Sequence, residues 1–472
     1  MAHLKKVAIL GGGISGLAAA HRLFELSDQE KIPLEITILE AAPRLGGVIE
    51  TVTRAGFQME SGPDMFITER PAALNLSRRL NLEPELLPVT QEHSQSYVLY
   101  RGKLRPIPRG FYLMASGQPA LLWSLPFIGP LGKARMLLEP WVPVRRDTGD
   151  ESVGSFIRRR FGAEALKRIG QPMIGGIYTA DPDRLSLQAT FPKFLEMERE
   201  HRSVIRALAK NKAAAAASGP RYQLFTTYRK GMQTLIEALQ TKISGRARIL
   251  TGRCVSEMAP HAGGWKIRCA GFPDMEADAV MLALPVRQAS RLLQTADAVL
   301  GRAVGEIESE SAATIHFAYR KADVPGLPHG AGFVVPLAEG GNLVGATLTH
   351  QKFAGRAPED GVLIRAFAGG FGRGKVLELA DEALIETVKH EIEKICAINA
   401  QPLFTSLKRY AGAMPQYAVG HAERVGHIRK KIERLNGIFL TGNYLRGVGI
   451  PDCVHESEDC ADKLLRWLMS RT

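Results

Sequence analysis

Six residues near the start of the chain, Gly11-Gly12-Gly13-Ile14-Ser15-Gly16, have the spacing of a dinucleotide-binding turn. In such a turn Gly11 permits the tight bend, Gly13 lets the backbone approach a pyrophosphate, and Gly16 lets the next helix pack closely. The free N–H groups and positive dipole end of that helix would face the phosphates. Glu40 lies 24 residues after Gly16, where a carboxylate can accept hydrogen bonds from both ribose hydroxyls. These residues predict a dinucleotide site.

The sequence around these residues predicts the elements that hold them. Lys6 to Leu10 is a short apolar run ending in glycines, which favours a buried strand of a parallel sheet. A helix from Ser15 to about Leu26 follows, and Glu35 to Leu39 is a second apolar strand. Near the C-terminus, Ile438 to Gly442 and Gly447 to Asp452 repeat the order of strand, glycine turn and helix start. We therefore expect one nucleotide domain assembled from both ends of the chain.

The composition is that of a folded, basic protein with more than one domain. Of its 472 residues, 45% are hydrophobic and 23% charged, which is typical of a globular chain too long for one simple core, so we expect two or three domains. The formal net charge of +13 favours anionic partners, which could be nucleic acid, acidic lipid or a substrate with several carboxylates. The basic residues are scattered and no nucleic-acid motif is present, so we expect no nucleic-acid partner.

The cysteines and histidines give no indication of a metal site. None of the five cysteines forms a C-x-x-C pair, and no histidine cluster has zinc spacing. We expect reduced thiols in a cytoplasmic protein. We expect no secretory signal, because glycines break the apolar stretch near the N-terminus. His421 and His455 have no acidic partner at a readable spacing, which favours surface positions for both.

The stretch from Phe111 to Gly132 contains 22 consecutive residues without a charge. That length could span a bilayer, but Pro119, Pro126 and Pro130 argue against one continuous helix. A pair of buried helices is the leading interpretation. The alternatives are an apolar wall of a ligand cavity and, given Trp123 and the basic surroundings, peripheral contact with the inner face of the cell membrane.

Five further segments resemble those of a known family. Arg44-Leu45-Gly46-Gly47, which begins four residues after Glu40, resembles the extended FAD motif of the amine oxidases and porphyrinogen oxidases. Four other motifs are similar, in chain order, to those of the oxygen-dependent protoporphyrinogen oxidase family and its bacterial coproporphyrinogen III oxidase form. They are Glu60-Ser61-Gly62-Pro63-Asp64, Gly175-Gly176-Ile177-Tyr178-Thr179-Ala180, Ala413-Met414-Pro415-Gln416-Tyr417 and Gly447-Val448-Gly449-Ile450-Pro451-Asp452-Cys453. Together they extend over nearly the whole chain.

This resemblance implies an α/β fold with three parts. A Rossmann-type FAD-binding domain is built from both chain ends, and it is joined by a mixed-sheet substrate domain and an inserted helical domain. Lys212 to Pro220, which contains five consecutive alanines, is expected to mark a boundary. The expected domains are residues 1–86 with 221–300 and 405–472 for FAD, 87–110 with 301–404 for the substrate, and 111–220 for the helical part.

The same resemblance implies a flavoprotein oxidase of haem biosynthesis with non-covalently bound FAD. A porphyrinogen would become a porphyrin in three two-electron oxidations, with O2 as the acceptor and H2O2 released. Hydride transfer to flavin N5 is chemistry of the cofactor, so no catalytic side chain is predicted. The resemblance leaves open whether the substrate is coproporphyrinogen III or protoporphyrinogen IX, and also the oligomeric state and any haem-pathway enzyme partners.

Carried over position by position, the resemblance identifies expected ligand contacts. The FAD contacts expected are Gly11, Gly12, Gly13, Ile14, Ser15, Gly16, Glu40, Ala41, Arg44, Gly47, Val48, Gly62, Pro63, Asp64, Met65, Val255, Gly442, Val448, Gly449 and Ile450. The substrate contacts expected are Arg70, Gly175, Gly176, Ile177, Val334 and Phe367. Among these, the Arg70 cation would pair with a propionate. The mitochondrial and plant forms have an Arg where this chain has Ser96, which favours coproporphyrinogen as the substrate.

Two other kinds of function stay open. An amine oxidase or carotenoid-type desaturase would share the fold and the flavin, but the covalent amine oxidases carry a flavin-linking Cys that Ala411 to Tyr417 lacks. A non-redox carrier of lipid or prenyl cargo could use the apolar stretch 111–132. Such a carrier would have no need of Gly449, which the resemblance locates beside the isoalloxazine ring.

Overall fold

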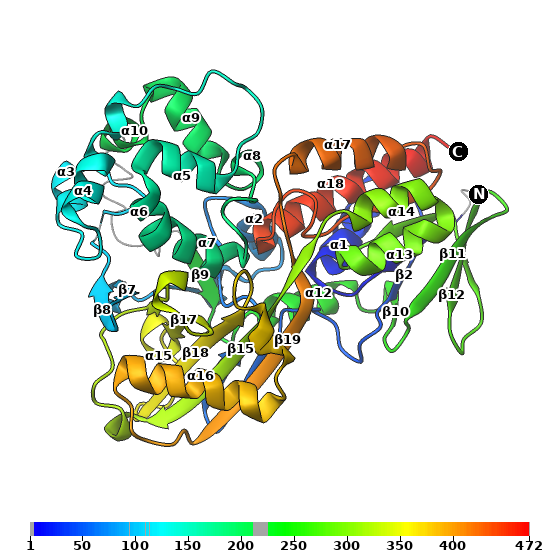
Figure 1. The fold of residues 1–472 in the computed structure, drawn as a ribbon. Coiled ribbons are helices and arrows are strands. Elements are labelled where there is room, and N and C mark those ends of the chain that lie inside the picture. The colour runs from blue at the N-terminus through cyan, green and yellow to red at the C-terminus, as the bar shows by residue number, and fades with distance from the viewer. Residues whose placement is uncertain (1–3, 94, 109, 113, 211–224, 472) are drawn as a thin grey trace.

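The glycine-rich turn follows β1 (Lys5–Leu10), which is the central strand of a five-stranded parallel sheet. The computed structural model describes residues 4–93, 95–108, 110–112, 114–210 and 225–471. The sheet has the order β10-β2-β1-β14-β20 and joins strands from both ends of the chain (Figure 1). Its other strands are β2 (Leu34–Leu39), β10 (Ala247–Leu250), β14 (Ala279–Leu282) and β20 (Ile438–Leu440). The last four residues of β1 are buried, because both faces of the sheet are covered.

Helices from the two chain ends cover one face of this sheet. α1 (Ile14–Glu30) packs against α18 (Ile450–Met469) and α12 (Gln233–Ile243), and Figure 1 shows α1 and α18 side by side. Their apolar side chains share one core with Val7 and Ile9 of β1. The expected α/β fold with a nucleotide-binding unit built from both ends is therefore confirmed. The first helix is longer than predicted, since it continues to Glu30.

The opposite face of the sheet is covered by three helices and a small antiparallel sheet. Their apolar side chains form a second core with Ala8 and Leu10 of β1. These elements are α13 (Val286–Ala296), α14 (Ala298–Gly305), α17 (His421–Ile432), β11 (Val255–His261), β12 (Gly264–Cys269) and β13 (Met275–Ala277).

A second large sheet has seven strands in the order β19-β15-β18-β17-β16-β7-β8. It is mixed, because β16 and β7 run parallel while the other neighbours are antiparallel. Its strands are β7 (Ser96–Tyr100), β8 (Lys103–Pro106), β15 (Ser309–Arg320), β16 (Gly332–Val334), β17 (Leu343–Leu348), β18 (Gly361–Gly369) and β19 (Phe404–Pro415). α16 (Asp381–Cys396) packs on one face, sharing a core with Ile315, Ile364 and Ala366. The other face is turned toward the nucleotide-binding loops.

The helical part lies between β8 and β9 (Phe225–Tyr228) in the sequence, and Figure 1 shows it above the mixed sheet. Its elements are α3 (Pro119–Trp123), α4 (Pro130–Leu137), α5 (Val153–Phe161), α6 (Ala163–Ala165), the π-helix Leu166–Gly170, α7 (Gln171–Tyr178), α8 (Leu187–Thr190), α9 (Pro192–His201) and α10 (Val204–Lys210). The segment 189–208 is not one continuous helix, because Pro192 begins a new helix and Arg202 is left-handed with φ 58°.

The uncharged stretch 111–132 differs from its leading interpretation of two buried helices, because it is only partly buried and its helical residues are those of α3 and the start of α4. Phe111, Leu122, Leu125 and Phe127 are buried, whereas Leu131 is exposed. No helix within the described ranges is long and apolar enough to cross a membrane.

The remaining elements are short and connect these parts. They are β3 (Thr51–Arg54), β4 (Phe57–Glu60), β5 (Phe66–Ile67), α2 (Ala72–Arg79), β6 (Leu86–Pro88), β9 (Phe225–Tyr228) and α15 (Thr349–Lys352). All five cysteines are free thiols, as expected. The boundary expected at Lys212 to Pro220 lies outside the described residues, and the domain limits stay a prediction.

Candidate functional site: the glycine turn and the surface beside it

The glycines of the first turn are there for two different reasons. A Cβ on Gly11 would lie 2.3 Å from the Ala283 carbonyl oxygen, and one on Gly16 would lie 2.0 Å from the Gly11 oxygen, so both positions are closed by protein. A Cβ on Gly13 would meet nothing closer than the Gly47 Cα at 3.9 Å. The backbone at Gly13 is therefore open on one side. An open glycine at the start of α1 is a cradle that fits a pyrophosphate.

The Glu40 carboxylate lies against this turn. Its Oε2 accepts a hydrogen bond from the Gly12 N–H at 2.7 Å, and its Oε1 accepts one from the Ala42 N–H at 2.7 Å. Each oxygen keeps a second acceptor position for a ribose hydroxyl. Val255, predicted to lie near the adenine, follows Arg253, whose N–H donates to the Glu40 carbonyl at 2.8 Å. The structure therefore brings Val255 to the end of the sheet where Glu40 lies.

Arg44 holds the second glycine turn in shape. Its Nη1 donates to the carbonyls of Leu45 and Ile49 at 3.0 Å, and its Nη2 donates to the Gly47 carbonyl at 2.7 Å. Gly47 faces Gly13 across the open cradle, at a φ of 58° that favours glycine. Because the Arg44 guanidinium is occupied by backbone, the structure explains this residue without any direct contact to a cofactor.

The segment Gly62–Met65 lies beside the second glycine turn, and together with Val48 it forms a surface that we call the wall. A Cβ on Gly62 would lie 1.9 Å from the Val48 carbonyl oxygen, so this segment packs directly on the residue after Gly47. Val48 itself is 45% exposed, which is unusual for valine and leaves an apolar surface open to a ligand. Asp64, by contrast, points into the protein, where its Oδ2 accepts a hydrogen bond from Lys352 Nζ at 2.7 Å.

The C-terminal glycines bring the start of α18 to this wall. A Cβ on Gly447 would collide with the Asp452 side chain at 2.3 Å, whereas one on Gly449 would have Asp452 Oδ2 at 3.1 Å as its nearest neighbour. Gly449 is the N-cap of α18, so the free N–H groups of a 20-residue helix start here. The positive end of this helix dipole favours negative charge beside Gly449.

His421 and Tyr417 support the loop before these glycines, and this role was missed from the sequence. The two rings stack with centroids 4.0 Å apart. His421 is buried, against the expectation of a surface position, and its Nε2 lies 3.2 Å from the Leu445 carbonyl oxygen. Tyr417 donates to the Asn443 carbonyl at 2.5 Å. Burial lowers the pKa of His421 to about 4, so the ring is neutral near pH 7. His455 is exposed.

The predicted substrate contacts converge on the mixed sheet. Val334 of β16 and Phe367 of β18 both pair with Gly345 of β17, so their side chains lie on the same face with only a glycine between them. Thr314 continues this row, and its hydroxyl donates to the Ser61 carbonyl at 2.9 Å. This face is thus turned toward the Gly62–Met65 segment.

Helix α7 lies over the same row of side chains. A Cβ on Gly176 would have Val334 Cγ1 as its nearest neighbour, at 3.9 Å. Ile177 is 41% exposed, and the adjacent Tyr178 packs on the same apolar cluster as Val334 and Val448. The sheet, α7 and the start of α18 therefore share apolar side chains that would suit a flat ligand.

Arg70 is the cation that the structure places beside this surface. It forms an ion pair with Asp452 in the first turn of α18, and its side chain is 48% exposed. The pKa of Arg70 is raised, because the effect of burial is outweighed by the hydrogen bond and charge of Asp452, with a smaller contribution from Tyr178. The structure therefore brings Arg70 to the start of α18 and close to Tyr178 of α7.

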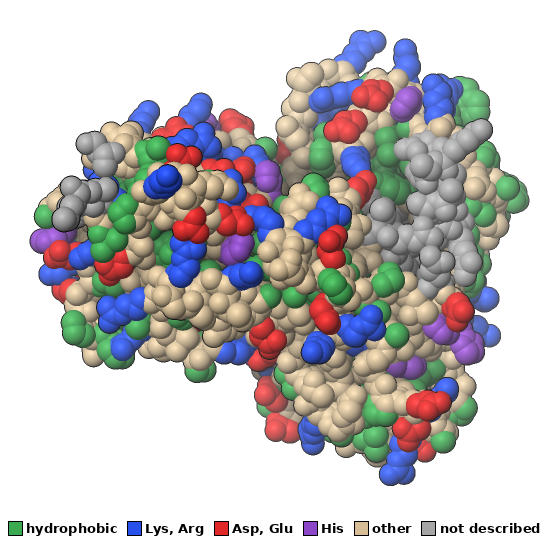
Figure 2. All heavy atoms as spheres, turned by 180° about the vertical axis from the view of Figure 1, so that it is seen from behind, with side chains coloured by type: hydrophobic (Ala, Val, Ile, Leu, Met, Phe, Trp, Pro, Cys, Tyr) green, Lys and Arg blue, Asp and Glu red, His purple; other side chains and the backbone are tan. Residues whose placement is uncertain are grey.

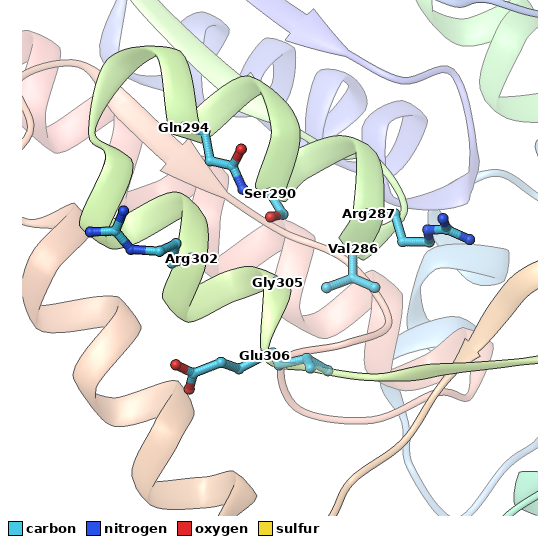
Figure 3. A pocket seen from close by; sticks show the side chains of 8 residues that line it. Val286, Arg287, Ser290, Gln294, Arg302, Gly305 and Glu306 are labelled. Atoms are coloured by element: carbon cyan, nitrogen blue, oxygen red, sulfur yellow. The ribbon is translucent and has the colours of Figure 1, made fainter.

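A separate surface groove of about 530 Å³ lies between α13 and α14. Figure 3 shows that Arg287 and Arg302 point to opposite ends of it, and Glu306 lies near Arg302. Its cations therefore do not converge on one ligand atom. Across the part of the chain that the structure describes, no three His, Cys, Asp or Glu side chains are grouped as a metal site.

Comparison with known proteins identifies relatives over the full length. A family model described as flavin containing amine oxidoreductase matches residues 14–465. The chain is 32% identical to a coproporphyrinogen III oxidase of Bacillus subtilis, covering 99% of both, and 30% identical to a coproporphyrinogen III oxidase of Staphylococcus aureus, covering 98% of this chain and 99% of the relative. A provisionally named protoporphyrinogen oxidase of Exiguobacterium has a crystal structure with a TM-score of 0.88 at 28% identity, covering 98% of this chain and 99% of that one.

Proposed function

The chain belongs to the flavin-containing amine oxidoreductases, and from this premise we propose that it oxidises a porphyrinogen to the porphyrin with FAD and O2. The observation that carries the proposal is similarity at 30–32% identity, over the whole chain, to proteins named coproporphyrinogen III oxidase. Coproporphyrinogen III is accordingly the substrate we favour. An amine is the second candidate, because the family includes amine oxidases.

The FAD would be held non-covalently by the loops of the nucleotide-binding unit. The open backbone at Gly13 and the start of α1 would bind the pyrophosphate, and Glu40 would bind the ribose. Val48, the Gly62–Met65 segment and the start of α18 would hold the flavin ring. When bound, the flavin supplies the two-electron acceptor for each oxidation and passes the electrons to O2, releasing H2O2.

The protein's own contribution would be position, charge and exclusion of water. Val334, Phe367 and the glycine-rich face of α7 would offer flat apolar surface to a tetrapyrrole, and a bound tetrapyrrole would exclude water from it. Arg70 would orient one propionate of the substrate. The helix start at Gly449 would stabilise negative charge that develops on reduction.

The test is anaerobic mixing of the purified yellow protein with each porphyrinogen, followed by admission of air. We expect the flavin absorbance to bleach rapidly with coproporphyrinogen III, and porphyrin fluorescence to rise when O2 enters. Preference for protoporphyrinogen IX would change the substrate but keep the reaction. A flavoprotein that bleaches with neither porphyrinogen but does bleach with an amine would refute the proposal.

We also propose peripheral contact of the helical part with an acidic membrane. Four large apolar side chains, Trp123, Leu131, Leu138 and Trp141, are more than half exposed on neighbouring elements, and Lys133 Nζ lies 5.9 Å from the Trp123 ring centroid. Exposed tryptophans next to lysines suit the interface of an anionic bilayer. On the face seen in Figure 2, by contrast, basic side chains alternate with acidic ones.

Vesicle flotation tests this contact. The wild type should float with vesicles containing anionic phosphatidylglycerol, and much less with pure phosphatidylcholine. The double variant Trp123→Ser and Leu131→Ser should stay at the bottom in both. Equal flotation of wild type and variant would refute a role for these side chains.

A further inference from the structure

Three charged side chains lie buried between the flavin-binding wall and the mixed sheet. Asp64 follows the Gly62-Pro63 turn, Lys352 ends α15, and Arg365 is in β18. All three are at most 9% exposed. Lys352 Nζ lies 2.7 Å from Asp64 Oδ2, and Arg365 Nη1 lies 3.7 Å from Asp64 Oδ1. One carboxylate is therefore shared by two cations away from water.

Neighbouring groups do not remove the excess of positive charge. Arg356 is 1% exposed, and its guanidinium donates to backbone carbonyls and to a threonine hydroxyl rather than to a carboxylate. Burial raises the pKa of the nearby Glu60 to about 7, which weakens its negative charge at neutral pH. Burial, with the charge of Arg365 next, lowers the pKa of His316 to about 3, so this ring adds no charge. Positive charge predominates in this buried cluster.

The Arg365 guanidinium contacts the backbone of the segment that would face the flavin. Its Nη2 donates to the Gly62 carbonyl and, at 3.4 Å, to the Ser61 carbonyl. Its guanidinium carbon also lies 4.8 Å from the ring centroid of Phe367, which is two residues along β18 and so on the same face. The cations therefore stand directly behind the Gly62–Met65 segment and beside the apolar row of the sheet.

We propose that Lys352 and Arg365 act as positioning charges that raise the reduction potential of the bound flavin. The inference rests on the placement of the flavin ring against the Gly62–Met65 segment. Reduction adds negative charge to the ring, and an uncompensated buried cation nearby stabilises that state because the interior screens charge weakly. Asp64 opposes the effect by neutralising one cation. The two cations thus make the flavin a stronger electron acceptor without contacting the substrate.

Charge-changing variants with opposite expected signs test this inference. Lys352→Met should shift the equilibrium between oxidised and reduced flavin about tenfold toward the oxidised form, the order expected of one unit charge at roughly 10 Å in a protein interior. This corresponds to a midpoint potential that is about 30 mV lower for a two-electron couple. Asp64→Asn should shift the midpoint potential in the opposite direction. Lys352→Arg should keep the wild-type value. The first readout is the midpoint potential from anaerobic dye-coupled reduction. The second is the Kd for sulfite, which adds to electron-poor flavins, so sulfite should bind more weakly to Lys352→Met.

A matched control removes the same charge elsewhere. Lys389 of α16 is equally buried and pairs with Glu386 and Glu393 of its own helix, so Lys389→Met should leave both readouts unchanged. Shifts of the same sign in Lys352→Met and Asp64→Asn would overturn the proposal, as would no shift in either. If Lys352→Met does not retain FAD, Arg365→Gln should show the lowered potential instead. Loss of FAD from both would mean that these cations serve binding alone, and would also overturn it. None of these readouts depends on a porphyrinogen.

Discussion

Replacing Arg70 by methionine should weaken substrate binding and leave turnover nearly unchanged. The substitution keeps an unbranched apolar side chain about as long as the methylene stem of arginine and removes the charged guanidinium. The Arg70 guanidinium donates a hydrogen bond to Asp452, and because a guanidinium has five N–H donors it can also bind a propionate. A charge-assisted hydrogen bond contributes about 1.5–3 kcal/mol when shielded from water. Since Arg70 is half exposed and solvent screens its charge, we expect a contribution below this range, about 1–1.5 kcal/mol.

This free energy corresponds to a KM that is about fivefold to tenfold higher. The propionate is remote from the reacting carbon and is bound equally in ground and transition states, so kcat should change little. Initial rates of porphyrin fluorescence, measured against porphyrinogen concentration in air-saturated buffer, separate the two constants. Arg78→Met is the matched control, because Arg78 is similarly exposed and pairs with Glu83 at the other end of α2. An unchanged KM in Arg70→Met, or an equal rise in Arg78→Met, would refute the assignment.

Three further outcomes follow from the structure. Gly16→Ala should abolish FAD retention, read as flavin absorbance per protein, because its Cβ would lie 2.0 Å from the Gly11 oxygen. Burial raises the pKa of Glu60 from its ordinary 4.5 to about 7, so between these pH values the folded protein holds a proton that the unfolded chain releases. As the pH rises from 5 to 8, the free energy of unfolding of the wild type should therefore fall by on the order of 3 kcal/mol relative to Glu60→Gln. Urea unfolding measures this difference. Glu139→Gln should cost about 3–5 kcal/mol and lower Tm, since Arg160 beside it is fully buried.

The nucleotide-binding half could be predicted from sequence because its signals are local. A strand, a glycine turn, a helix and a terminal acid occur within 40 residues, and the observed β1, α1 and β2 reproduce that order. The hairpin of β7 and β8 is local in the same sense, since Arg101 and Gly102 both adopt the left-handed conformation that its tight turn needs. Short-range patterns were sufficient wherever chain neighbours are also spatial neighbours.

The cluster behind the flavin wall could not be predicted in this way. Asp64 is 288 residues from Lys352, and neither residue has a local pattern that points to the other. His421 was assigned to the surface because no acid lies at a suitable spacing, but its partners are the Tyr417 ring and the Leu445 carbonyl. The sequence alone does not identify a stacking ring or a backbone oxygen as the partner of a histidine. Pairings formed by the tertiary fold need the fold itself.

The parallel sheet also has a consequence for synthesis. β1 lies between β2 and β14, and β14 follows it by about 270 residues, while the start of α18 is about 430 residues beyond the glycine turn. At roughly 5–20 residues per second, a ribosome needs about 20–90 s to supply that last helix. Until β14 has been made, about 270 residues after β1, the apolar β1 has only β2 as a neighbour in the sheet. The flavin-binding unit can therefore close only after nearly the entire polypeptide has been made, and its early strands need protection from aggregation until then.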